Sequence, residues 1–297
     1  MRGSFIFGFT LAALMALAAC GDYRGQSNKQ TEDPNAAIDA NIQKLTEAQR
    51  KLSANPTDPT ALSVILKLLK DSNGINRSNA AHTLGEVGAE HGDIIETSAV
   101  PLLIEMAEHG DGGDQYAAVK ALRSFGPHAA AAKPLLRQML SSPVQQMSWI
   151  AAETLGRMKE AAADAVPDLV KTIQEHRAEC RDDELHICRY AIQALGNIGP
   201  TATGAKSDLI RLLGDENLYL RAYAAVALIK IEPRAQEPLP VIAILLADKN
   251  VEVRRRIIWE LKDAAREAKP AKALVRTALG DSDEAVRQAA SDLLKSL

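Results

Sequence analysis

Apolar residues recur at spacings of three and four along most of the chain, which is the pattern of amphipathic helices. The first such stripe consists of Ile38, Ile42, Leu45, Ala48 and Leu52. Asp33-Pro34 precedes it as an N-cap followed by a first-turn proline, and Asn55-Pro56 ends it. We therefore expect a helix over residues 34–55 that caps the open end of the remaining chain. A dimerising coiled coil is the alternative, although the stripe is short for one.

Residues 57–297 repeat one unit, which contains two helical patterns separated by a turn. The most regular column of the repeat is formed by Leu84, Leu122, Leu155, Leu195, Leu228, Leu261 and Leu294. Four residues before each lies Ala80, Ala118, Ala151, Ala191, Ala224, Ile257 or Ala290. The leucine spacings are 38, 33, 40, 33, 33 and 33 residues, so the sequence predicts about seven helix pairs with a seven-residue insertion in the fourth.

The turn inside the unit has its own signature, an aspartate thirteen residues before the column leucine. The aspartates are Asp71, Asp182, Asp215, Asp248 and Asp281, and six residues after them come Arg77, Cys188, Arg221, Arg254 and Arg287. We expect the aspartate to cap the second helix of the unit. The arginine should reach backbone carbonyls or the aspartate of a neighbouring unit. His109 and Ser142 replace the aspartate in the second and third units, which predicts an interruption there.

This combination of columns resembles the HEAT repeat, in particular the short bacterial type found in phycobilisome lyases. The resemblance covers about four-fifths of the chain. It implies an all-α fold, an α-solenoid built as a right-handed superhelix whose second helices line the concave face. An aromatic content of only 4% agrees with closely packed helices, because such a core is filled by Ala, Leu, Ile and Val.

The N-terminus resembles the signal peptide of a bacterial lipoprotein. Arg2 is followed by an uncharged stretch from Gly3 to Ala19, and Leu17-Ala18-Ala19 immediately precedes Cys20. The resemblance implies removal of residues 1–19, acylation of Cys20 and a polar, flexible tether over 20–33. An ordinary signal peptide is the alternative. We thus expect a lipid-anchored protein of the bacterial cell envelope, facing the periplasm, with the bilayer as one partner.

Charge and motifs give no sign of nucleic-acid binding or catalysis. The chain has 35 Lys and Arg against 38 Asp and Glu, a net charge of −3, so it lacks the basic patch typical of nucleic-acid binders. It contains no phosphate-binding loop, nucleophile elbow or zinc-protease motif, and no His is followed directly by Glu. We expect no cofactor and no enzymatic activity.

One cluster, in the insertion of the fourth repeat, leaves three interpretations open. It contains His176, Cys180, His186 and Cys188. In an exported protein a Cys180–Cys188 disulfide is the first choice and two free thiols the second. A metal site is the third, because the spacing is irregular for zinc. The alternative function is an enzyme or metal-dependent sensor that uses the His176–Cys188 loop.

A candidate binding stripe lies two and six residues before the column leucine, on the opposite side of each second helix. Its members include both tryptophans and several charged residues, and Trp, Tyr and Arg are enriched at binding hot spots. The candidates are Tyr116, Lys120, Trp149, Glu153, Arg189, Gln193, Arg255 and Trp259. Each tryptophan alone could equally fill a gap between repeats. As a set, they predict a scaffold that binds a protein partner through its concave face.

Overall fold

The computed structural model describes residues 34–180 and 187–297. The chain divides into two units, Met1–Ala37 and Ile38–Leu297, and the second unit contains the helical repeats. The predicted signal peptide (1–19), the acylated Cys20 and the tether (20–33) lie outside the described residues. No helix within the described part of the chain combines the length and apolarity needed to cross a bilayer.

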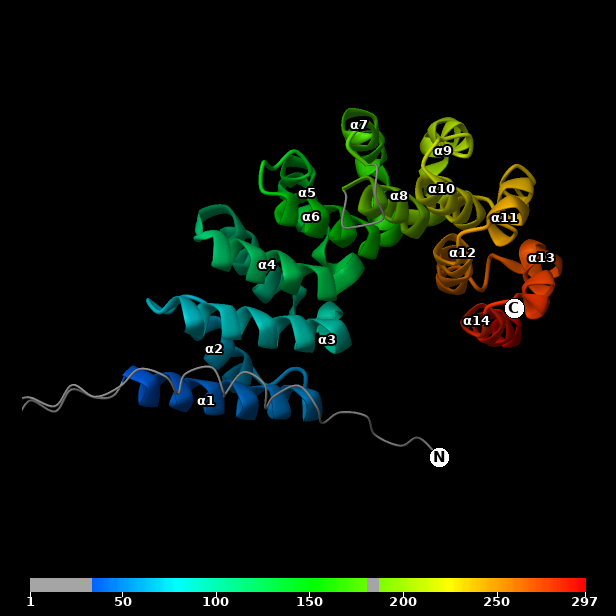
Figure 1. The fold of residues 1–297 in the computed structure, drawn as a ribbon. Coiled ribbons are helices and arrows are strands. Elements are labelled where there is room, and N and C mark those ends of the chain that lie inside the picture. The colour runs from blue at the N-terminus through cyan, green and yellow to red at the C-terminus, as the bar shows by residue number, and fades with distance from the viewer. Residues whose placement is uncertain (1–33, 181–186) are drawn as a thin grey trace, which may run out of the picture. The chain divides into compact units, whose positions relative to one another are not determined.

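Every regular element in residues 34–180 and 187–297 is helical, and the fold is an all-α solenoid (Figure 1). The α-helices are α1 (Pro34–Ala54), α2 (Pro59–Leu68), α3 (Gly74–His109), α4 (Gly112–Phe125), α5 (Lys133–Met139), α6 (Gln145–Arg157), α7 (Val166–His176), α8 (Ile187–Ile198), α9 (Lys206–Leu212), α10 (Leu218–Ile231), α11 (Pro238–Leu246), α12 (Val251–Asp263), α13 (Lys272–Thr277) and α14 (Glu284–Ser296). Short 3-10 helices are η1 (Gly126–Ala132), η2 (Lys159–Ala165), η3 (Gly199–Ala205), η4 (Lys269–Ala271) and η5 (Ala278–Gly280).

These elements form helix pairs that follow the sequence repeat. The helix α3 contains two members of different pairs, because its backbone leaves the helical conformation at His91 (φ −136°, ψ 32°). Its first part pairs with α2, and its second part pairs with α4. The later pairs are α5 with α6, α7 with α8, α9 with α10, α11 with α12, and α13 with α14. The second helices of consecutive pairs pack against one another from α4 to α14.

The core consists of the predicted columns. From Leu84 to Leu261 every column leucine is almost completely buried, as is each member of the alanine column. Leu294 in the last helix, α14, is only partly buried. The stripe of α1 is divided: Leu45, Ala48 and Leu52 join the core, while Ile42 is exposed. Gln49 of α1 also donates a hydrogen bond to Glu86 of α3 (3.0 Å).

At three of the interfaces, consecutive second helices approach each other through a glycine and an alanine. The glycine directly follows the column leucine of one repeat, and the alanine directly precedes the column leucine of the next. A Cβ added to Gly156 would lie only 2.8 Å from the Cα of Ala194, and one added to Gly196 would lie 3.0 Å from the Cα of Ala227. The close approach explains the glycine of the Ala-Leu-Gly segments.

The helix caps lie two residues beyond the predicted ones. The caps of α3, α10, α12 and α14 are Asn73, Asn217, Asn250 and Asp283, two residues after the column aspartate. The aspartate instead accepts the backbone N–H of the cap residue itself, as Asp281 does from Asp283 (2.8 Å). Each turn therefore needs a pair of short polar residues, one to fold the turn and one to cap the helix.

Two of the column arginines, Arg77 and Arg254, link the turns of neighbouring repeats as predicted, while Arg221 and Arg287 donate to carbonyls of their own turns. Arg77 donates to the carbonyl of Asp71 in its own turn (3.0 Å) and to the carboxylate of Asp114 in the next repeat (2.6 Å). Arg254 joins the Asp248 carbonyl and the Asp281 carboxylate in the same way. The Arg254 guanidinium holds the pKa of Asp281 below its ordinary value through these hydrogen bonds.

We expect Gly156→Ala to destabilise the protein by about 1–3 kcal/mol, because the new methyl group would force α6 away from the α8 backbone. Thermal or urea unfolding measures the change. Gly112→Ala is the matched control, since nothing lies within 4 Å of its added Cβ, and it should be neutral or slightly stabilising. Equal losses in both variants would contradict the close-approach explanation.

Candidate functional site

A pocket of about 470 Å³ lies on the second helices of the central repeats, and we call it the central groove. Its lining residues belong to α6, α8 and α12 and to the start of η2. Figure 1 shows where the three α-helices lie along the solenoid. The lining residues are Glu153, Gly156, Arg157, Lys159, Arg189, Tyr190, Gln193, Ala194, Asn197, Trp259, Glu260 and Asp263. Four of the predicted stripe residues are among them, from three different repeats.

The groove joins α8 to α12 across the intervening helix α10. The stripe positions of α10 carry only Ala222 and Val226, and both are buried. The Gln193 side chain of α8 donates a hydrogen bond to the Glu260 carboxylate of α12 (3.0 Å). Small residues on α10 therefore allow the repeats on either side to contact each other.

Several aromatic side chains lie at and beside the groove. Trp149 stacks on Tyr190 with ring centroids 6.0 Å apart, and it packs partly against the core. The Arg189 guanidinium lies over the rings of Tyr190 and Tyr223, 5.8 and 5.6 Å from their centroids. Trp259 differs from these residues because it is 69% exposed. Such an exposed ring at the edge of a pocket is available to a partner.

Each carboxylate of the groove has a cationic partner that does not line it. Glu153 pairs with Arg123 (2.8 Å), and Asp263 pairs with Lys230. Glu260 pairs with Arg256 at 3.6 Å. Burial raises the pKa of the Glu260 carboxyl, although the Gln193 hydrogen bond and the charges of Arg189 and Arg256 act in the opposite direction.

The remaining predicted stripe residues lie outside the central groove. Tyr116 and Lys120 of α4 line a separate pocket of about 380 Å³ against α3. Arg255 of α12 lies at the next repeat interface, where its guanidinium binds the Asp283 carboxylate that caps α14 (3.1 Å). Its geometry gives Arg255 a role in joining repeats six and seven.

Several residues of the groove are absent from the predicted stripe. Arg157, Asn197 and Asp263 all lie two residues after a column leucine, one helical turn beyond that stripe. Extending the stripe by four residues would have found them. The sequence also marks Glu260 as unusual, because the equivalent position holds Thr or Ala in the preceding repeats.

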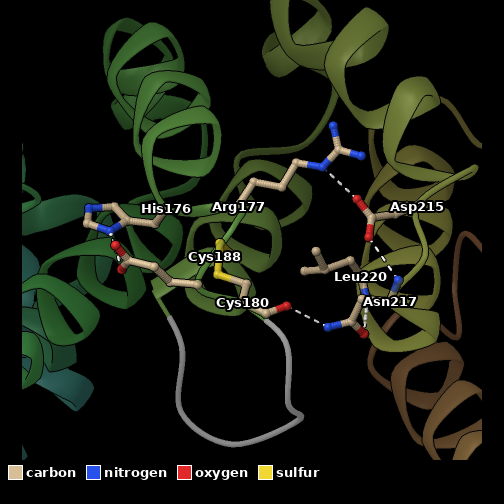
Figure 2. The surroundings of a disulfide bond; sticks show 8 residues. His176, Arg177, Cys180, Cys188, Asp215, Asn217 and Leu220 are labelled. Carbon is tan, nitrogen blue, oxygen red and sulfur yellow. Dashed lines mark hydrogen bonds and ion pairs between the residues drawn. A yellow bond between two sulfur atoms is a disulfide. The ribbon is translucent and has the colours of Figure 1, made fainter.

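The insertion of the fourth repeat contains a disulfide between Cys180 and Cys188, with Cα atoms 6.4 Å apart (Figure 2). Asn217, the cap of α10, donates a hydrogen bond to the Cys180 carbonyl (2.6 Å). His176 contacts Glu179, and His186 lies outside the described residues. No cluster of three metal-ligating side chains occurs in the described parts of the chain. Because a metal ion binds thiolates, neither bonded sulfur offers the ligand that a zinc site would require.

Comparison with known protein families identifies the repeat. The profile of HEAT repeats matches residues 36–123, 62–151 and 100–185, which together span just over half of the chain. The chain belongs to the HEAT-repeat family. A search of curated proteins found no significant match.

Solved structures share the HEAT-repeat fold at low sequence identity. The complex of CpcE and CpcF of phycocyanin lyase from Nostoc sp. PCC7120 is 21% identical, with a TM-score of 0.54 over 80% of this chain and 94% of that one. An engineered protein is 19% identical, with a TM-score of 0.54 over 90% of this chain and 76% of that one. At these identities the likeness concerns the fold alone.

One cysteine of the disulfide occupies the position of the column arginine in the fourth HEAT repeat. Cys188 occupies that position, and Arg177 at the end of α7 supplies the missing guanidinium. Its Nε donates to the Asp215 carboxylate of the next repeat (2.6 Å), as Figure 2 shows. The inter-repeat contact is therefore kept, although it comes from a different segment.

We expect reduction to lower the melting temperature, because the chain-entropy cost of the closed loop corresponds to about 2–3 kcal/mol. Melting with and without reductant measures the effect on the full chain. A Cys180→Ser/Cys188→Ser variant should melt at the lower temperature and should not respond to reductant. If thiol titration of the unreduced, denatured protein finds both cysteines free, the disulfide is disproved.

Proposed function

We propose that this protein is a lipid-anchored scaffold of the bacterial cell envelope whose HEAT repeats bind a partner protein in the central groove. The family supports the coarser part of this proposal, a helical repeat scaffold for protein interaction. The observation that carries the finer part is the groove itself, in which residues from three repeats converge on one pocket beside an exposed tryptophan.

The proposed anchor is Cys20. An uncharged stretch ending in Leu17-Ala18-Ala19 precedes this cysteine, and a polar segment follows it. Acyl chains contribute roughly 0.8 kcal/mol per buried CH₂, so several chains on one cysteine hold a protein firmly at a bilayer. The polar segment would let the HEAT repeats reach partners near that membrane.

The proposed scaffold has no enzymatic activity. Lyase activity belongs to the CpcE–CpcF complex by its name, and a shared repeat fold does not transfer an activity. The alternative site at the His176–Cys188 loop has both of its sulfurs in a disulfide.

We expect Trp259→Ala to weaken partner capture by about 2 kcal/mol, the loss typical of hot-spot truncations, with little change in melting temperature. Pull-down from envelope extract with titrated bait measures capture. Ile244→Ala in α11 is the matched control, because Ile244 is a similarly exposed apolar residue (57%) outside the groove. Trp149→Ala should reduce both capture and stability, since its ring also packs on the core. Undiminished capture by Trp259→Ala would refute the groove as the binding site.

We expect Cys20→Ser to abolish lipid labelling and to release the protein from the membrane fraction or leave its signal peptide uncleaved. Membrane fractionation and labelling with a radioactive fatty acid measure both effects. The Cys180→Ser/Cys188→Ser variant is the control for loss of a cysteine and should remain lipidated. Unchanged labelling of Cys20→Ser would rule out this anchor.

A further inference from the structure

The cations that line the central groove form no ion pair with its carboxylates. Glu153, Asp263 and Glu260 each pair with a cation that does not line the pocket. Within the described parts of the chain, no hydrogen bond or ion pair engages the side chains of the three lining cations. These cations are Arg157, Lys159 and Arg189. The groove therefore presents an excess of positive charge on a chain whose net charge is −3.

Arg189 contains a buried donor without an acceptor. Its Nε has no hydrogen-bond partner, while the guanidinium is held against the rings of Tyr190 and Tyr223. Leaving a buried charged donor unpaired is costly, and a carboxylate is the acceptor that fits a guanidinium best. The positive charge of Arg189 acts on the Glu260 carboxylate, but no hydrogen bond joins the two side chains. Glu260 accepts a hydrogen bond from Gln193 through Oε2, and its buried Oε1 has no hydrogen-bond partner.

Lys159 occupies a backbone position that favours glycine. It lies four residues after its column leucine and has φ +53°. The equivalent positions in the adjoining repeats are Gly126 (φ +55°) and Gly199 (φ +78°). A lysine in this left-handed conformation is strained relative to glycine, and such strain is typical of functional sites. The lysine therefore places a cation at the groove in spite of the backbone strain.

We propose that the partner presents an acidic peptide segment, whose Asp or Glu carboxylates bind Arg189, Arg157 and Lys159 while an apolar side chain packs on Trp259. This inference rests on the proposed function and specifies the chemistry of its partner. Charge complementarity supports it: the lining carboxylates are already paired, and the lining cations are not. A basic segment would instead compete with Arg123, Lys230 and Arg256 for carboxylates that already have an ion-pair partner, and only Oε1 of Glu260 lacks a hydrogen bond among the buried oxygens of these carboxylates.

The test selects peptides from a random phage-display library on the full chain in detergent, then measures the binding of the synthesised peptides. We expect the selected peptides to be rich in Asp and Glu and to bind more weakly as salt is raised. Arg157→Gln/Lys159→Gly should weaken binding about tenfold or more. Because Lys159→Gly relieves the strained backbone, the same variant should be no less heat-stable than the wild type. Arg189→Gln should weaken binding as well.

Arg234→Gln/Lys249→Gln is the matched control, since it removes two exposed cations away from the groove. Acidic peptides that lose affinity in the groove variant and keep it in the control support the proposal. Equal losses in both variants, an uncharged or basic consensus, or no selected peptide would overturn it. Selected peptides that depend on Trp259 but not on the cations would leave the proposed groove standing and refute only its acidic partner. Independence from both would count against the proposed groove as well.

Discussion

The close approach of consecutive second helices is the constraint on which the rest of this structure depends. Between α6 and α8, and between α8 and α10, a glycine after one column leucine meets an alanine before the next, leaving no room for even a methyl group. At the next interface the corresponding residues are Ile229 and Glu260. A β-branched residue and a carboxylate cannot pack as Gly and Ala do, and at the α4–α6 interface Arg123 and Thr154 replace the pair as well. The central groove includes residues of both kinds of interface, since Gly156 and Ala194 line it together with Glu260.

The inter-repeat ion pairs show that the fold keeps a contact even where its column residue is lost. Arg77 and Arg254 reach an aspartate of the next repeat from the second helix. In the fourth repeat Cys188 fills the arginine position, and Arg177 reaches Asp215 from the end of α7 instead. The disulfide secures the segment that follows Arg177, because Cys180 is bonded to α8 and its carbonyl accepts a hydrogen bond from Asn217. The fourth repeat thus lacks the contact of a column arginine but is joined to the fifth by two hydrogen bonds, Arg177 to Asp215 and Asn217 to the Cys180 carbonyl.

Periodicity was sufficient to predict the helix pairs, the buried columns and the direction in which the arginines reach. It failed at the helix caps and where a side chain is positioned by a neighbour outside its own repeat. The cap lies two residues beyond the column aspartate, because a turn of this length needs one polar side chain for itself. Arg255 fitted the binding stripe but meets Asp283 across the interface. The contact of Gln193 with Glu260 spans 67 residues and depends on the small side chains of α10, which a single-helix pattern does not contain.

The residues that break the repeat pattern are therefore the ones that build the groove. Lys159 stands where the adjoining repeats have glycine, and Glu260 stands where the preceding repeats have Ala or Thr. Ala222 and Val226 stand where the adjoining repeats have large polar or aromatic residues. Each exception alone is unfavourable or neutral for packing: a strained backbone, a buried carboxyl and a gap on the helix surface. Together, Lys159 and Glu260 place a positive and a negative charge at the pocket, and the small side chains of α10 leave room beside them. The stacking of repeats does not require this combination. Their convergence on one pocket supports the proposed binding site in this part of the solenoid.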